Sequence, residues 1–400
     1  MVMGKHVLFI SENESVPGDL RVWSEARALR DRGYEVSVIS PKGGDENKAF
    51  ELIEGIRVYR HPMPIEAESK VGFLVEYLNA LIWEGIITIR IFFSKPFQII
   101  HGGNPPDLIF LVALMYKLFG VKYVFDHHDI VPENYLAKFG KRDFFYWILC
   151  LLEKLTFSTA DIVISTNNSY KHIAVARGKK RESEVFVVRN GPDLSRIAFV
   201  PPNEKLKDGF DYMVAYVGVI GSQEGIDVLL EAVKYIVYGR GIHNIKFIIV
   251  GKGPHWRKMS ELSKKMKLEK FVTFTGFIPY IQLYEVLATA DVCVNPEHRN
   301  SFTDKSTMMK IMDYMVFGKP IVQFDTKEGR VTAGDCAIYV RENDTYEFAD
   351  AIVSLLNNPR KREKMGEIGK KRMFESLNWD RQEVNLQTAY EYLETKHNIY

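Results

Sequence analysis

Charged and polar side chains gather between residues 290 and 325, where a short apolar strand ends in a polar loop. A helix follows, and Gly-Lys-Pro then leads into another apolar strand. Apolar residues recur along the helix at the spacing of one buried stripe, whereas Ser306, Lys310 and Asp313 fall on the opposite face. The polar residues of the loop are Glu297, Arg299, Asn300, Asp304 and Lys305. Open α/β sheets bind ligands beyond the carboxyl ends of their strands, so this segment predicts half of a ligand cleft.

A glycine-containing loop opens the second half of the chain. Gly218 and Gly221 follow an apolar strand, and Ser222 and Gly225 lead into the next helix. Glycine lets the backbone approach a phosphate closely, and the amide groups at a helix start favour an anion. A glycine pair after a strand is a weak signal alone, because any tight strand-to-helix turn can use it. Its place at the first strand of this half strengthens the prediction of a phosphate-binding loop.

Four titratable residues follow an apolar strand in the first half, namely Asp126, His127, His128 and Asp129. Such a run could hold a metal ion. Consecutive side chains of an extended chain point to opposite sides, however, and no third group of ligands is evident. We therefore expect no metal site, and we expect His127 to be structural.

Strand-like apolar runs alternate with helical patterns along the chain. The expected strands are 6–10, 35–39, 56–59, 97–100, 122–125, 161–165, 185–188, 213–217, 246–250, 272–275, 291–295 and 320–324. This alternation predicts an α/β protein with parallel sheets covered on both faces. The Pro-rich, charged stretch 200–210 is the best linker candidate. We expect domains at residues 1–197 and 198–375, followed by a C-terminal helix at 376–400.

The composition is that of a soluble globular protein of ordinary domain size. Its 400 residues suggest two domains, with 46% hydrophobic and 26% charged residues. A formal net charge of +2 gives no support to nucleic-acid binding. The three cysteines lack metal-site spacing and favour a reducing compartment. The chain starts without a signal-peptide layout, so we expect a cytoplasmic protein.

Two stretches, 71–93 and 138–157, are unusually rich in apolar and aromatic residues. No run approaches the ~20 apolar residues that a membrane-spanning helix needs. Core helices of an α/β domain explain most of these residues. Alternatively, the aromatic residues beside Lys138, Lys141 and Arg142 lie among lipid headgroups at a membrane surface.

The chain resembles the retaining glycosyltransferases of the GT-B class, specifically glycosyltransferase family 4. The second half of that family's donor signature, an acid followed by x-Met-Ala-x-Gly-x-Pro and an apolar strand, matches the run from Asp313 to Pro320. Further matches are 217–221, 250–254, 274–277 and 190–193. The resemblance covers nearly the whole chain and is strongest from 216 to 325. It implies two Rossmann-like domains with parallel sheets facing across a cleft, and a last helix that packs back on the N-terminal, acceptor-side domain.

The resemblance implies a nucleotide-sugar site in the second domain. In the family, the acid at the position of Asp313 holds the ribose hydroxyls, and a carboxylate can accept from both. Phe277 and Ile278 match the turn that clamps the base. Gly251 and Gly253 resemble a loop that lines the nucleotide, although turn structure explains them equally well. The donor-binding set is completed by Gly218, Gly221, Ser222, Glu297, Lys305 and Ser306.

Three positions depart from the family pattern. Val219 and Glu224 stand where relatives commonly place an arginine and a lysine in the glycine loop, and Lys305 stands at the first acidic position of the signature. The cations for the phosphates must then come from elsewhere, and Lys310 and Arg299 are the best substitutes, with Lys305 left open.

Lys310 is the first choice because it shares a helix face with Asp313. The alternative is that these cations are solvated, or are ion-pair partners of Asp304 and Asp313.

In the first domain the resemblance places His128 beside the donor sugar, where it could hydrogen-bond a hydroxyl or position the acceptor. A hydrogen bond to Asp126 alone is the competing explanation. Relatives also use a glycine-containing loop after the first strand, which makes Gly18, Asp19 and Arg21 candidates. Helix capping by Asp19 competes closely with this role. The weaker cleft candidates are Asn104 and Glu133.

These observations predict a retaining, metal-independent hexosyltransferase with no cofactor, which uses a UDP- or GDP-sugar. We expect His128, Lys310 and Arg299 to be its catalytic residues. The expected acceptor is a saccharide or lipid-linked saccharide in cell-surface glycan assembly, with peripheral contact at the inner face of the membrane. Two alternatives share the fold: a sugar-nucleotide 2-epimerase, and a catalytically degenerate protein that serves as the partner of another chain.

Overall fold

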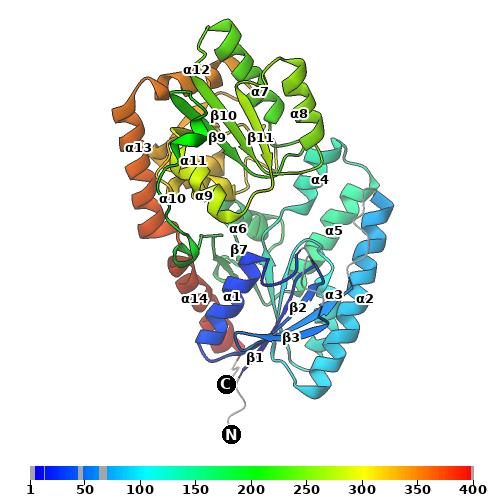
Figure 1. Cartoon of the computed structure of the whole chain (residues 1–400). Coiled ribbons are helices and arrows are strands. Elements are labelled where there is room, and N and C mark those ends of the chain that lie inside the picture. The colour runs from blue at the N-terminus through cyan, green and yellow to red at the C-terminus, as the bar shows by residue number, and fades with distance from the viewer. Residues whose placement is uncertain (1–4, 13, 44–47, 63–69, 398–400) are drawn as a thin grey trace. The chain divides into compact units, whose positions relative to one another are not determined.

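The computed structural model describes residues 5–12, 14–43, 48–62 and 70–397, although it leaves the side chains of 70, 71, 73 and 74 undescribed. The chain divides into two compact units (Figure 1). Unit 1 contains Met1–Asn190 and Trp379–Tyr400, and unit 2 contains Gly191–Asn378. The boundaries expected after residues 197 and 375 thus compare with divisions after 190 and 378.

Unit 1 is built on a sheet with the strand order β3-β4-β2-β1-β5-β6-β7-β8. Its pairs are parallel except β3 with β4, which is antiparallel. Strand β1 is buried along its whole length, as expected for the centre of a parallel sheet covered on both faces. The strands are β1 His6–Ile10, β2 Glu35–Pro41, β3 Phe50–Ile53, β4 Ile56–His61, β5 Ile99–Gly103, β6 Lys122–His127, β7 Ile162–Ser165 and β8 Val185–Val187.

Helices cover this sheet, and the last helix of the chain is one of them. Leu386, Tyr390 and Leu393 of α14 are buried in the same core as Phe9 of β1. The helices of unit 1 are α1 Leu20–Asp31, α2 Lys70–Ser94, α3 Ile109–Lys117, α4 Val131–Phe139, α5 Phe144–Thr159, α6 Asn168–Ala176, η1 Glu182–Glu184 and α14 Trp379–His397. The C-terminal helix therefore belongs to unit 1.

Unit 2 contains a parallel sheet with the order β11-β10-β9-β12-β13-β14. Its strands are β9 Tyr212–Val217, β10 Ile245–Val250, β11 Val272–Gly276, β12 Val292–Asn295, β13 Ile321–Phe324 and β14 Ala337–Val340. Its helical segments are η2 Leu194–Arg196, η3 Glu204–Lys207, α7 Ile226–Lys234, η4 Tyr235–Gly239, α8 Trp256–Lys265, α9 Tyr280–Thr289, α10 Met309–Val316, α11 Lys327–Ala333, η5 Gly334–Cys336, α12 Thr345–Leu356, α13 Pro359–Arg372 and η6 Met373–Leu377.

Every strand expected from the sequence is present, β1 with the expected ends and the others with shifted ends, whereas β3 and β14 were not expected. β3 contains Glu51 and exposes Phe50 and Leu52, so it lacks the continuous apolar run of a buried strand. β14 is an apolar run of only four residues, of which only Val340 is buried. The expectation that no segment reaches membrane-spanning length is wrong for Val75–Ser94 of α2. By length and composition this segment passes, with a mean hydropathy of 1.2, although Glu76, Glu84 and Arg90 interrupt its apolar run.

Candidate functional site

Two glycine-containing loops pack directly against each other at the carboxyl ends of β9 and β10. The N–H of Gly218 donates to Val250 O at 3.0 Å, and the N–H of Ile220 donates to Lys252 O at 3.0 Å. A Cβ on Gly251 would lie 1.9 Å from Gly218 O, where the backbone φ is +128°. Only glycine fits this approach. The predicted donor residue Gly251 therefore has a structural reason to be glycine that needs no ligand. Gly253 has a similar reason, because a Cβ there would lie 2.5 Å from Ile220 O.

A third loop joins these two from the end of β12. A Cβ on Gly225 would lie 1.8 Å from Pro296 O, so the glycine lets the start of α7 contact this loop. Glu297 follows directly and is almost fully buried. The carboxyl ends of three neighbouring strands thus bring the glycine loop and Glu297 together, as the sequence predicts.

Lys310 reaches this corner from α10. Its ammonium forms an ion pair with Glu297, lies 3.4 Å from the hydroxyl of Tyr216 and lies 5.0 Å from the centroid of that ring. A Cβ on Gly218 would lie 2.9 Å from Lys310 Cε. Burial alone would lower the pKa of Lys310, but Glu297 and Tyr216 outweigh burial and raise it. A permanently charged cation is therefore held against the glycine loop.

Asp313 lies one turn along α10 and has different surroundings. Burial raises the pKa of its carboxyl to about 7. Its charge also contributes, after burial, to the raised pKa of Tyr284 on α9. The sequence placed Lys310 and Asp313 on one helix face, yet the first contacts the glycine loop and the second influences α9.

The other charged candidates of the 297–306 loop are engaged with the protein. Arg299 Nε donates to Asp304 Oδ1 at 3.0 Å, and that oxygen also accepts from the N–H of Lys327 at 2.9 Å. Ser306 Oγ donates to Phe302 O at 2.8 Å. Lys305 is half-buried, and its N–H donates to Phe302 O. Arg299 is therefore an ion-pair partner of Asp304, which is the alternative to a phosphate-binding role.

Ser222, Phe277 and Ile278 differ in their exposure. Ser222 is exposed in the glycine loop. Phe277 is 79% exposed and follows Gly276, whose φ is +70°. Ile278 packs on the apolar core instead. An exposed aromatic ring at the carboxyl end of a strand is available to stack on a flat ligand.

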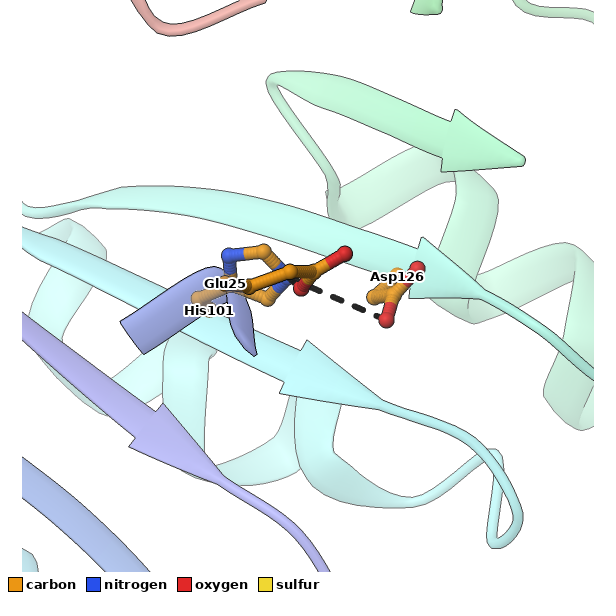
Figure 2. Close-up of side chains that lie close together, drawn as sticks. All are labelled: Glu25, His101 and Asp126. Carbon is orange, nitrogen blue, oxygen red and sulfur yellow. Dashed lines mark ion pairs between the residues drawn. The ribbon is translucent and has the colours of Figure 1, made fainter. Parts of the chain in front are cut away.

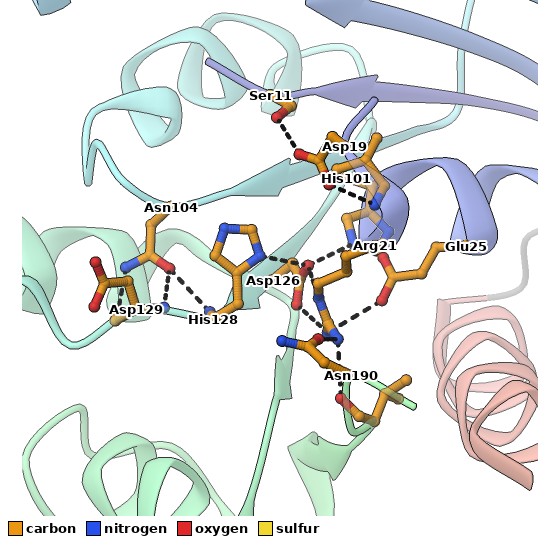
Figure 3. Close-up of polar contacts among 12 residues, drawn as sticks. Ser11, Asp19, Arg21, Glu25, His101, Asn104, Asp126, His128, Asp129 and Asn190 are labelled. Carbon is orange, nitrogen blue, oxygen red and sulfur yellow. Dashed lines mark hydrogen bonds and ion pairs between the residues drawn. The ribbon is translucent and has the colours of Figure 1, made fainter. Parts of the chain in front are cut away.

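In unit 1, Arg21 of α1 is the centre of a buried polar network (Figure 3). Its guanidinium donates to both oxygens of Asp126, at 2.7 and 2.6 Å, and lies 3.1 Å from Glu25. It also donates to Val188 O at 3.1 Å and to Asn190 Oδ1 at 2.5 Å. Such a bidentate pair fixes orientation as well as charge. Arg21 therefore ties α1 to the ends of β6 and β8.

His128 extends this network from the residue after β6. Its Nδ1 lies 3.3 Å from Asp126, and Gly103 makes room for the ring, since a Cβ there would lie 3.0 Å from His128 Cε1. Burial would lower the pKa of His128, but Asp126 outweighs it and raises it. Burial would likewise raise the pKa of Asp126, but Arg21 and His128 lower it. His127 is a buried ring whose pKa falls to about 3 through burial.

Glu25, His101 and Asp126 form one group whose ligand atoms lie within 4.8 Å of one another (Figure 2). Oxygen and imidazole ligands suit several divalent metals. However, Arg21 already supplies a positive charge to both carboxylates, and His101 Nε2 lies 3.2 Å from Glu25 while its Nδ1 lies 2.8 Å from the hydroxyl of Tyr390. The three side chains are thus engaged in ion pairs within the protein, although the Glu25 oxygens accept no hydrogen bond from the described residues.

The remaining unit 1 candidates hold the backbone. Asp19 caps α1 by accepting from the N–H of Val22 at 3.1 Å, which is the alternative considered for it. Gly18 is required by contact, because a Cβ would lie 2.8 Å from Ser15 O. Asn104 Oδ1 accepts from the N–H groups of His128 and Asp129, both at 3.0 Å.

Glu133 forms a bidentate ion pair with Arg177, at 2.8 and 2.9 Å. Arg177 also binds Glu153 at 2.6 Å.

Sequence reasoning did not single out several members of these clusters. Tyr216 contacts Lys310, while Glu25, His101 and Asn190 contact the Arg21–Asp126 pair or each other. One signal was available, because Glu25 stands four residues after Arg21 and thus on the same helix face. Tyr216 looks like any core residue of an apolar strand.

Two family models match the chain and together span most of it. "Glycosyltransferase Family 4" matches residues 20–196, and "Glycosyl transferases group 1" matches residues 211–358. The boundary between them falls near the division between the two units.

Curated relatives are similar over part of their length. A capsular polysaccharide biosynthesis glycosyltransferase of Staphylococcus aureus is 24% identical over 65% of this chain and 67% of its own length. A component of the phosphatidylinositol N-acetylglucosaminyltransferase of Arabidopsis thaliana is 22% identical over 69% of this chain and 58% of its own length. An alpha-D-kanosaminyltransferase of Streptomyces kanamyceticus is 27% identical over 39% of each chain.

Solved structures show the same fold over nearly the whole chain. A sucrose-phosphate synthase of Thermosynechococcus elongatus has a TM-score of 0.80 and 19% identity, covering 98% of this chain and 100% of that one. HepE of Anabaena, solved with UDP and glucose, has a TM-score of 0.72 and 16% identity over 98% and 100%. Two parallel-sheet α/β units in one chain are thus the GT-B fold.

Proposed function

The chain belongs to the GT-B glycosyltransferases of the family 4 type, and we propose that it transfers a hexose-type sugar from a nucleoside diphosphate sugar bound by unit 2. The observation that carries this proposal is the position of Lys310, whose ammonium is held against the backbone of Gly218 at the carboxyl ends of the strands. A phosphate needs a cation and a backbone that it can approach closely, and Lys310 and the glycine positions of this loop supply them.

Departure of the diphosphate from the sugar builds negative charge on its oxygens. In our proposal Lys310 and the amide groups of the glycine loop stabilise that charge, so no metal ion is required. Asp313 binds the ribose hydroxyls as a carboxylate, and the exposed ring of Phe277 stacks on the base. Retention of the sugar configuration is part of the proposal, and the resemblance to a retaining family is what supports it.

UDP is the first nucleotide to test, because HepE of Anabaena has been solved with UDP-glucose. GDP is the second. For the acceptor we propose a saccharide in the assembly of a polysaccharide or another glycan, since the staphylococcal relative is named for capsular polysaccharide biosynthesis. His128 of unit 1, whose pKa is raised through its contact with Asp126, is our candidate for positioning a hydroxyl group.

We also propose that unit 1 binds the surface of an anionic membrane, where a lipid-linked acceptor would lie. Helices α2, α3 and α5 contact one another in sequence, α2 with α3 and α3 with α5. Their outer faces expose large apolar side chains, with Leu118 90% and Trp147 60% exposed. The others are Val75, Leu78, Ile82, Trp83, Ile86, Ile89, Phe93, Leu111, Leu114, Met115, Phe119, Phe144, Phe145, Leu151 and Leu155. We call this set the apolar face.

Basic residues stand beside the apolar face. Lys138 lies 5.7 Å from the ring centroid of Phe139, and Arg142 lies 5.8 Å from that of Tyr146. Cations beside aromatic rings suit the headgroup layer of an anionic membrane. Helix α2 also packs on β2 and β4, so one side of it is covered by protein. This arrangement favours a helix that lies on the membrane over one that crosses it.

Vesicle flotation tests the membrane proposal. We expect the protein to float with vesicles that contain phosphatidylglycerol and to remain unbound with phosphatidylcholine alone. Replacing Leu118 and Trp147 together by serine should abolish flotation. Replacing Tyr346 and Val384, exposed apolar residues that do not belong to this set, should not. Equal flotation of both double variants would refute this part of the proposal.

A donor assay separates the proposed reaction from its two rivals. The protein is incubated with UDP-glucose, UDP-N-acetylglucosamine and GDP-mannose, with and without a saccharide acceptor. Transfer or slow hydrolysis releases the nucleoside diphosphate, whereas a 2-epimerase yields a new sugar nucleotide without any acceptor. A degenerate partner protein would do neither, and the departures at Val219, Glu224 and Lys305 are what favour that alternative.

A further inference from the structure

The carboxylate of Glu224 folds back onto the glycine loop. Its Oε2 atom accepts hydrogen bonds from the N–H of Gly221 at 3.0 Å and from the N–H of Gln223 at 3.2 Å. A Cβ on Gly221 would lie 2.7 Å from the same oxygen, so the glycine permits this approach. Backbone amides that converge on one oxygen form a site for an anion. Here the anion is the protein's own side chain.

The same corner holds more negative than positive charge. Lys310 is paired with Glu297, and Glu224 adds a second carboxylate. The charges act on a common neighbour, because the pKa of Tyr216 is raised by burial first and then by Glu297 and Glu224, while Lys310 opposes them. The three groups sum to one negative charge. A diphosphate that entered with Glu224 in place would therefore meet repulsion as well as occupied amides.

We propose that Glu224 is a tethered anion, which occupies the amides that bind the donor diphosphate and must leave them when the diphosphate arrives. The inference rests on the proposed function of unit 2. A competitor on the same chain acts at a fixed effective concentration, so it lowers the binding affinity of every diphosphate ligand by a similar factor. It lowers the affinity for the product nucleotide together with that for the donor and thereby aids product release. Glu224 thus sets the affinity of the donor site.

A purely local role for Glu224 makes the opposite prediction. If the side chain only caps the loop, its loss leaves amides unpaired and disorders the site, so ligand affinity should fall from wild type to Glu224→Gln and further to Glu224→Ala. If it is a tethered anion, glutamine keeps a neutral and weaker acceptor, and alanine frees the amides altogether. Affinity should then rise in the same order of variants.

Calorimetric titration with UDP, GDP and inorganic pyrophosphate at low salt distinguishes these two orders of ligand affinity among the variants. We expect Glu224→Gln to bind about threefold and Glu224→Ala about tenfold more tightly than wild type, the effects of a weakened and a lost charged hydrogen bond. The gain should shrink at high salt, which screens the charge. Glu231→Gln is the matched control, because it removes the same charge from the exposed side of α7, where Glu231 pairs with Lys234. Melting temperatures without ligand verify that each variant folds.

Unchanged or falling affinity in the two Glu224 variants overturns the inference and leaves the donor site itself intact. A complete lack of binding by wild type and by all variants overturns both the inference and the proposed function. A gain that appears equally in Glu231→Gln shows a general charge effect and also overturns the tethered-anion role.

Discussion

Units 1 and 2 both place a polar cluster at the carboxyl ends of parallel strands, but the two clusters hold their cations differently. In unit 1 the Arg21 guanidinium donates to both oxygens of Asp126, to Val188 O and to Asn190 Oδ1, and the side chains of Arg21 and Asp126 are 8% and 1% exposed. In unit 2 the Lys310 ammonium pairs with Glu297 beside Gly218, and Glu224 accepts from amides of the same glycine loop. A guanidinium with several fixed, directional partners holds elements in place, whereas an ammonium and a side-chain carboxylate beside a loop can exchange their partners for a ligand.

The largest predicted effect comes from breaking the unit 1 network. Asp126→Asn should lower the free energy of unfolding by about 3–5 kcal/mol, because it leaves a buried guanidinium without its charged partner. Urea denaturation measures this loss. Asp350→Asn is the control, since Asp350 pairs with Arg240 at the surface and its loss should cost less than about 1 kcal/mol. Similar losses in the two variants would show that the Arg21 network does not hold unit 1 together.

The glycine loop should be sensitive to a single added methyl group. Gly251→Ala should cost about 2–4 kcal/mol and weaken nucleotide binding, because the new Cβ meets Gly218 O at a positive φ. Gly33→Ala is the matched control, as its φ is +89° but nothing lies within 4 Å of the added carbon. It should cost only about 1 kcal/mol. If both variants lose the same stability, the contact between the two loops has no energetic weight.

The pH dependence of stability should distinguish Asp313, whose pKa is raised, from Asp126 of unit 1, whose pKa is lowered. Its pKa of about 7 in the folded state means that the folded chain keeps a proton that the unfolded chain releases near pH 4. This contribution to stability is present at low pH and falls as pH rises toward 7, by about 2 kcal/mol between roughly pH 5 and pH 7. Asp313→Asn should remove that slope.

The pH dependence of nucleotide affinity also tests Asp313, but affinity should rise with pH where stability falls. If Asp313 binds the ribose as a carboxylate, wild-type affinity should rise as pH increases through about 7, while the asparagine variant stays flat. Parallel pH profiles for the two proteins would contradict this role.

The smallest predicted effect concerns Arg299. Its contact with Asp304 is at the surface, so Arg299→Ala should change stability by less than about 1 kcal/mol. Nucleotide affinity should change far less than when Lys310 is replaced. A large loss of affinity would return Arg299 to the catalytic set expected from the sequence.

The sequence predicted the fold well because apolar strands and polar strand ends follow local rules. The position of Lys310 near the glycine loop followed from the same rules, since parallel strands end at one edge of the sheet. The pairing of Arg21 with Asp126 could not be read, because it joins residues far apart in the chain. The hydrogen bonds of Glu224 to the glycine loop could not be predicted from the sequence either, because they depend on the side-chain rotamer and on loop geometry.

The central claim is that Lys310 serves a ligand rather than the core, and titration with UDP and GDP tests it most directly against a matched lysine. Lys246 is also buried, pairs with Asp208 and lies 5.4 Å from the ring centroid of Phe210, but it stands near the start of β10. We predict that Lys310→Met loses more stability than Lys246→Met, because it leaves the buried Glu297 unpaired, whereas Asp208, the partner of Lys246, is 72% exposed. Only Lys310→Met should lose nucleotide affinity, by about tenfold or more. Equal affinity in the two variants would contradict the account.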